Sequence, residues 1–113
     1  MYKQGQIWLI DFDPSVGHEY QKVRPALVVE SNVYLPLGNL ITVIPISSQI
    51  AKSTLLDVVI PKESINRLMS DSLIKTRQIS TFDQQRFIRQ IGICNNAVLQ
   101  SVLQNLVLYF DLP

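Results

Sequence analysis

The sequence contains few of the residues that form covalent or metal cross-links. Its 113 residues include one cysteine, Cys94, and one histidine, His18. A single cysteine excludes an intramolecular disulfide, and one cysteine with one histidine cannot supply the four nitrogen or sulfur ligands of a usual structural zinc site. We therefore predict a fold without an intramolecular disulfide or a structural zinc site, and we expect no cofactor.

Long apolar runs and a strong charge excess are also missing. No stretch approaches the ~20 consecutive apolar residues of a membrane helix, and Met1 is not followed by the apolar run of a signal peptide. The formal net charge is only +1, so an anionic partner would have to be bound by a local patch. We expect a cytoplasmic protein that does not bind a membrane, with a single domain over residues 1–113.

Short segments rich in Ile, Val and Leu dominate the chain. They are separated by stretches containing Pro, Gly, Ser and Asn, a spacing that is typical of a small antiparallel β-fold. Strands are predicted at residues 6–12, 25–29, 40–46, 55–60 and 72–79. Five or more short strands indicate a barrel.

The C-terminal segment has helical spacing. Asn95 or Asn96 can cap a helix whose apolar positions are Val98, Leu99, Val102, Leu103, Leu106, Val107 and Phe110. This stripe is wide for a helix that covers a sheet with one face. It fits a helix that only caps the barrel, and it equally fits one that also contacts a second subunit. The predicted fold class is therefore α+β.

A polar cluster precedes the second predicted strand, in GHEYQKVRPALVV at residues 17–29. The DFDPSVG segment before it is typical of an exposed turn that carries His18 and Glu19. These two residues are either a solvated pair or an acid and a base. Arg24 precedes a proline that favours extended geometry, so its guanidinium lies at the start of an apolar strand. There it can bind a phosphate or pair with a nearby carboxylate.

Two further segments offer groups that can bind anions. Ser47, Ser48 and Gln49 follow the third predicted strand, where they form either a site or a plain turn. Because the chain has no GxSxG elbow and no phosphate-cradling glycine loop, Ser47 is expected to form hydrogen bonds rather than to act as a nucleophile. Lys75 and Arg77 would share one face of the strand at 72–79, and this basic face would contact nucleic acid or keep a sheet edge soluble.

Three segments together resemble the MazF/PemK family, small toxins of bacterial type II toxin–antitoxin pairs: GQIWLIDFDPSVGHEYQKVRPALVVES, ITVIPISSQ and SLIKTRQISTFDQQR. The most specific part is DFDPSVGHE followed by RPALVV. The resemblance implies an SH3-like, partly open antiparallel barrel with a C-terminal helix. It also implies a homodimer that cleaves single-stranded RNA without a metal. A cognate antitoxin is the other implied partner, and DNA would be contacted only through that antitoxin.

The resemblance also implies functional residues. The family's catalytic arginine corresponds to Arg24, and its threonine or serine corresponds to Ser47. Together with the basic segment, it predicts substrate contacts at His18, Glu19, Gln49, Lys75, Arg77 and Gln78, and Phe12 and Tyr20 are candidates to stack on bases. The expected reaction is attack of the RNA 2′-hydroxyl on the adjacent phosphorus, which leaves a 2′,3′-cyclic phosphate and a 5′-hydroxyl.

The last segment departs from the family pattern. Several members carry an Asp directly before the fifth-strand Gln, and some carry an Arg two residues before that Asp, where this chain has Arg77 and Lys75. Without that carboxylate, Glu19 or His18 would have to transfer protons. The CcdB toxins, which poison DNA gyrase, share the expected fold, so gyrase binding is the alternative function. An inactive toxin that only binds its antitoxin is a third.

Overall fold

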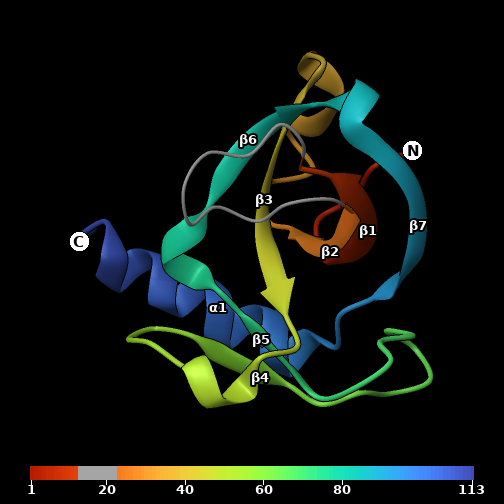
Figure 1. The fold of residues 1–113 in the computed structure, drawn as a ribbon. Helices are drawn as coiled ribbons and strands as arrows, with labels where there is room; N and C mark the ends of the chain where they lie inside the picture. The colour runs from red at the N-terminus through yellow and green to blue at the C-terminus, as the bar shows by residue number, and fades with distance from the viewer. Residues whose placement is uncertain (13–22) are drawn as a thin grey trace.

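The computed structural model describes residues 1–12 and 23–113. These residues form seven strands and one α-helix, α1 (Asn96–Tyr109) (Figure 1). The strands are β1 (Gln6–Asp11), β2 (Val23–Val28), β3 (Leu40–Ser47), β4 (Val58–Ile60), β5 (Ser72–Ile74), β6 (Ser80–Asp83) and β7 (Phe87–Ile93).

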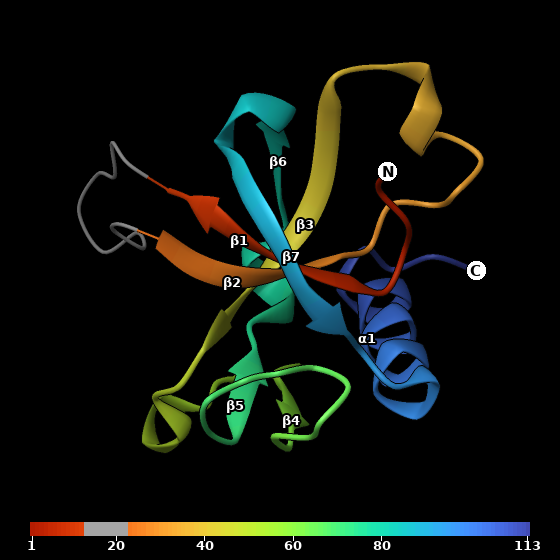
Figure 2. The same ribbon diagram turned by 90° about the vertical axis from the view of Figure 1, so that its right-hand side faces the viewer.

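The strands form one antiparallel sheet in the order β4-β5-β3-β2-β1-β7, and β6 also pairs with β3. Strand β3 is the centre of this arrangement, because it pairs with β6 through residues 40–43 and with β5 through residues 46–47. The sheet curves strongly without closing (Figure 2). This architecture confirms the predicted partly open antiparallel barrel with a C-terminal helix.

The core consists of two apolar clusters on the two sides of the curved sheet. The cluster beside α1 contains Ile7, Leu27, Ile44, Ile74, Leu99 and Val102. The other contains Ile10, Ala26, Val28, Val43 and Phe87. Full burial of one such aliphatic or aromatic side chain contributes roughly 1.5–3 kcal/mol relative to its exposure. Strands β1 and β2 contribute side chains to both clusters. This packing fixes the position of the start of β2, where Arg24 lies.

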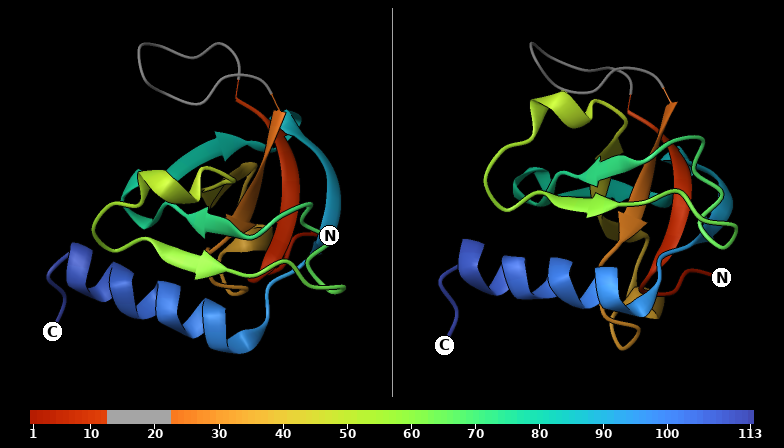
Figure 3. Two further views of the ribbon diagram at one scale, coloured as in Figure 1. Left: turned by 60° about the horizontal axis from the view of Figure 1, so that its bottom comes forward. Right: turned by 90° about the horizontal axis from the view of Figure 1, so that it is seen from below.

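Helix α1 begins as the sequence predicts, since the Oδ1 atom of Asn95 accepts the backbone N–H of Val98 at 2.9 Å. The helix lies across one side of the sheet next to β4 (Figure 3). Apolar side chains near its C-terminal end are exposed, namely Leu108, Tyr109, Phe110 and Leu112. In the described part of the chain, no helix is long and apolar enough to cross a membrane.

Two predicted strands are shorter than expected. The strand at 55–60 begins only at Val58, because residues before it form a 3-10 turn and a loop. The prediction of a strand at 72–79 was wrong beyond Ile74, because Lys75 leaves the sheet and Thr76–Gln78 form a 3-10 turn. Strands β6 and β7 were not predicted from the sequence.

Candidate functional site

Arg24 and Ser47 lie at neighbouring ends of β2 and β3. These strands pair through Leu27 with Ile44 and through Ala26 with Pro45, and two further steps in this register align Arg24 with Ser47. Arg24 is exposed, whereas Ser47 is half-buried. The extended backbone of β2 thus brings the two predicted catalytic residues to the same end of the sheet.

The hydroxyl group of Ser47 already makes one hydrogen bond. Its Oγ atom accepts the backbone N–H of Gln49 at 3.1 Å, within the turn that follows β3. A hydroxyl can accept and donate at the same time, so this bond orients Ser47 and leaves its hydrogen for an oxygen of a ligand. The Gln49 side chain is exposed beside it.

A pocket of about 340 Å³ opens next to Arg24. Strands β1, β2, β3, β5 and β7 contribute to its wall, together with the loop of residues 61–71. It is lined by Leu9, Arg24, Pro25, Ile46, Ser48, Arg67, Leu68, Met69, Ser70, Ser72, Arg89 and Ile91. We call this the arginine pocket, because its described lining residues include three arginines and no Asp or Glu.

The three arginines lack acidic partners. Arg24, Arg67 and Arg89 are exposed, and within residues 1–12 and 23–113 none of them forms an ion pair. Like charges in one pocket repel each other, and an anion relieves that repulsion while accepting planar, bidentate hydrogen bonds from a guanidinium group. The arrangement is therefore chemically suited to binding a phosphate group.

Arg67 and Arg89 were not among the site residues predicted from the sequence. Arg67 lies in a loop with no recognisable motif, and Arg89 lies on β7, which was not predicted. Arg89 pairs with Leu9 of β1, and Leu9 also pairs with Pro25 of β2. Its place beside the start of β2 follows from this strand order, and a correct prediction of β7 would have suggested it.

Lys75 does not belong to the arginine pocket. Its Nζ atom lies 2.6 Å from Oδ2 of Asp57, 3.1 Å from the carbonyl oxygen of Lys52 and 3.4 Å from Oγ1 of Thr54. The side chains of Lys75 and Asp57 are only 8% and 1% exposed. The prediction that Lys75 and Arg77 share an exposed strand face was therefore wrong.

The remaining predicted site residues are less closely grouped. Arg77 and Gln78 are exposed on the 3-10 turn at Thr76–Gln78. Phe12 is buried against Phe82, with 5.1 Å between ring centroids, so it packs in the core rather than stacking on a base. His18, Glu19 and Tyr20 lie outside the described residues. Among the residues that are described, no group of three or more His, Cys, Asp or Glu side chains could hold a metal ion.

Comparison with known proteins identifies the family. A model of the PemK-like, MazF-like toxins of type II toxin–antitoxin systems matches residues 3–110. The endoribonuclease MazF9 of Mycobacterium tuberculosis is 33% identical over 117 residues, which covers 99% of this chain and 98% of that protein. The endoribonuclease EndoA of Bacillus subtilis is 30% identical over 100 residues, with 88% and 86% covered.

Solved structures agree on the fold. The crystal structure of MazF from Deinococcus radiodurans matches with a TM-score of 0.83 at 24% identity, covering 98% of this chain and 97% of that one. These comparisons do not favour the gyrase-binding alternative. They confirm the resemblance that the sequence motifs suggested, and the chain belongs to the family of PemK-like, MazF-like toxins of type II toxin–antitoxin systems.

Proposed function

We propose that this chain is an endoribonuclease that cleaves single-stranded RNA at a phosphate bound in the arginine pocket. One observation carries the proposal: Arg24 lines a pocket with two further arginines and no carboxylate, at the end of the sheet where β3 supplies the Ser47 hydroxyl. Support also comes from relatives of nearly the same length that are named endoribonucleases.

The reaction requires the stabilisation of negative charge. The 2′-oxygen of the RNA loses its proton and bonds to the adjacent phosphorus, the bond from phosphorus to the 5′-oxygen breaks, and that oxygen takes up a proton. The products are a 2′,3′-cyclic phosphate and a 5′-hydroxyl. The intermediate phosphorane carries more negative charge than the diester, so the guanidinium of Arg24 would bind it more tightly than the substrate.

Ser47 would help to orient the substrate. Its free hydroxyl hydrogen would be donated to a non-bridging phosphate oxygen or would hold the 2′-hydroxyl in line. Arginine is a poor base at neutral pH, so proton transfer falls to other groups, and Glu19 and His18 stay the candidates. Since the guanidinium groups supply the positive charge at the phosphate, we propose that the reaction needs no metal ion.

The proposed partners follow from the same surfaces. An antitoxin with an acidic segment would complement the arginine pocket and compete with RNA. A homodimer would cover apolar side chains that are exposed in the single chain, such as those after residue 107 of α1. We expect both interactions in the cytoplasm.

The test is incubation of the purified protein with a long single-stranded RNA in EDTA, beside the Arg24→Ala variant. We expect the wild type to cut at a recurring short motif, leaving cyclic-phosphate ends, and the variant to leave the RNA intact. Equal cleavage rates for the two proteins would contradict the role of Arg24. Intact RNA with a folded wild-type protein would contradict the activity itself.

A further inference from the structure

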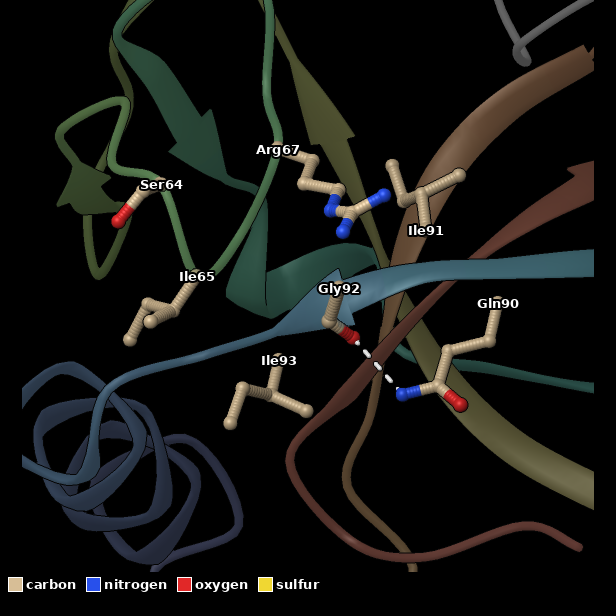
Figure 4. Close-up of a pocket in the computed structure, with 7 residues that line it drawn as sticks. All are labelled: Ser64, Ile65, Arg67, Gln90, Ile91, Gly92 and Ile93. Carbon is tan, nitrogen blue, oxygen red and sulfur yellow. Dashed lines mark hydrogen bonds between the residues drawn. The ribbon is translucent and has the colours of Figure 1, made fainter.

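The arginine pocket continues into a second pocket of about 350 Å³. This pocket is lined by Ser64, Ile65, Arg67, Gln90, Ile91, Gly92 and Ile93 (Figure 4). We call it the isoleucine pocket. Arg67 and Ile91 line both pockets, so the two form one continuous surface along β7.

The loop that carries Arg67 is held together by Asn66, which is fully buried. Its Nδ2 atom donates to the carbonyl oxygen of Pro61 at 2.8 Å, and its Oδ1 atom accepts the backbone N–H groups of Glu63 and Leu68, each at 3.0 Å. All polar atoms of the Asn66 side chain are thus engaged within the loop. Such a network keeps the loop in one conformation.

The same loop is fixed to β7 by a close backbone contact. The backbone N–H of Ile93 donates to the carbonyl oxygen of Ile65 at 2.9 Å. A Cβ atom at Gly92 would lie only 2.5 Å from that oxygen and 2.6 Å from backbone atoms of Asn66. Glycine is therefore required at position 92 for the loop to approach the strand.

Arg67 itself has a left-handed backbone conformation, with a φ angle of 55°. This backbone conformation is unfavourable for residues other than glycine. It persists where the surrounding structure imposes it, often at binding sites. The carboxylates of its loop are engaged elsewhere, because Glu63 accepts from Asn95 Nδ2 and Asp71 accepts from the backbone N–H of Lys62. The Arg67 guanidinium consequently faces the two pockets, and it has no ion-pair partner among the residues that the structure describes.

We propose that Arg67 binds a second RNA phosphate, next to the one that is cleaved, and that the isoleucine pocket receives the base of the adjoining nucleotide. The proposal rests on the proposed ribonuclease function. Ile65, Ile91 and Ile93 offer an apolar surface for the face of a base. Gln90 donates from Nε2 to the carbonyl oxygen of Gly92 at 3.3 Å, which leaves its Oε1 atom to accept a hydrogen bond from a base edge (Figure 4).

The test measures binding of short RNAs whose 2′-oxygens are methylated, so that they cannot be cleaved. The wild type is compared with Arg67→Gln, and with Arg67→Gly, which removes the side chain and suits the left-handed backbone. Lys62→Gln is the matched control, because it removes one positive charge from the same loop outside both pockets. Circular dichroism verifies that all four proteins are folded.

We expect both Arg67 variants to bind a hexanucleotide several-fold more weakly than the wild type or Lys62→Gln. For single-stranded nucleic acid, the loss of one phosphate contact lowers the slope of log affinity against log salt by about 0.7. Binding of a dinucleotide with a single phosphate should change much less in the Arg67 variants, because the proposal places that phosphate on Arg24 and not on Arg67. A length dependence of this kind would not result from a general structural defect.

Two outcomes would overturn the proposal. One is that Arg67→Gln and Lys62→Gln weaken hexanucleotide binding equally. The other is that the Arg67 variants bind the hexanucleotide as tightly as the wild type but bind a poly-glutamate peptide more weakly. That result would assign the pocket to an acidic protein segment. If either result is obtained and the wild type still binds and cleaves RNA, the proposed ribonuclease function stands and only the Arg67 site is wrong. If the wild type bound no RNA, the proposed function itself would fail.

Discussion

Positive side chains occur in two different environments in this protein. Lys75 is buried and bonded to Asp57 at 2.6 Å, with two more oxygen partners nearby. Arg24, Arg67 and Arg89 are exposed and line one pocket, and no carboxylate of residues 1–12 or 23–113 pairs with them. A buried charge must be paired for the fold to be stable, whereas an unpaired charge at a pocket is available for a ligand.

We assign a structural role to the first environment and propose a functional role for the second. The Lys75–Asp57 pair connects the start of the turn after β5 with the loop that precedes β4. Its loss should reduce stability and leave the chemistry of the folded molecule unchanged. Loss of an arginine from the pocket should leave the stability of the fold nearly unchanged and reduce RNA binding or cleavage. Variants in each environment therefore test this difference between the buried lysine and the pocket arginines.

The largest effect is expected for Arg24→Ala. We predict a loss of about 10³-fold or more in RNA cleavage, because the variant removes a charged, bidentate donor to the phosphorane. The free energy of unfolding should change by no more than about 0.5 kcal/mol, since the side chain is exposed. Single-turnover cleavage and urea denaturation measure the two quantities. A large loss of stability in this variant would contradict the functional assignment.

Asp57→Ala should have the opposite profile. It leaves the Lys75 ammonium buried without its partner, so we predict that the free energy of unfolding falls by about 3–5 kcal/mol. Replacing both residues by apolar side chains of similar size, with Asp57→Leu and Lys75→Met, should restore most of it. Cleavage per folded molecule should match the wild type in both cases. Reduced cleavage by the folded double variant would indicate that Lys75 acts on RNA after all.

Gly92→Ala tests how the arginine pocket is supported. The new methyl group would collide with the backbone of Ile65 and Asn66, so the loop must move away from β7. We predict a loss of about 1–3 kcal/mol in stability, accompanied by weaker RNA binding. Gly38→Ala is the control, because a Cβ atom there meets nothing within 4 Å. Equal behaviour of the two variants in thermal unfolding would show that the loop is not held by this contact.

Arg67→Gly should affect stability and RNA binding differently, with smaller changes than the preceding variants. Relief of the left-handed conformation favours the folded state by about 1–2 kcal/mol, and the greater freedom of glycine in the unfolded chain offsets about 0.4–1 kcal/mol of it. We predict unchanged or slightly higher stability with weaker RNA binding. A clear decrease in the unfolding midpoint in urea would mean that the Arg67 side chain supports the fold.

The smallest effect concerns Cys94. Burial, with the nearby charge of Glu63, raises the pKa of its thiol from 9.0 to about 11. Below pH 9 the thiol is therefore neutral in the folded protein. Because the thiol ionises more readily in the unfolded chain, the free energy of unfolding falls as the pH rises from about 9 toward 11. We expect negligible labelling by a thiol reagent at pH 8 and full labelling in denaturant. Rapid labelling of the folded protein would contradict the burial of Cys94.

Much of the fold could be predicted from regular patterns. The strands β1, β2 and β3, and the helix with its Asn95 cap, have clear apolar periodicity and clear ends. Strand β7 was missed because Ile88, Arg89 and Gln90 are exposed in succession, and its pairing with β1 shifts register twice. Alternation is lost where a strand bulges, so the pattern alone did not indicate a strand there.

The candidate site was predictable only where a motif marks it. Arg24 and Ser47 follow from the RPALVV and IPISSQ segments. Arg67 was not predictable, because its place depends on a buried asparagine and a glycine contact far along the chain. Lys75 was misplaced because the predicted strand continues to residue 79, which puts the Lys75 side chain on an exposed strand face. Its partner Asp57 lies in a segment that is itself predicted as a strand.

The most direct measurement is an NMR titration of the protein with a non-cleavable single-stranded RNA, following the side-chain Nε–H signals of the arginines. We predict that the signals of Arg24, Arg67 and Arg89 shift together, while that of Arg77, on the 3-10 turn outside the pocket, does not. Shifts confined to Arg77, with the three pocket arginines unchanged, would contradict the assignment of the arginine pocket as the phosphate site.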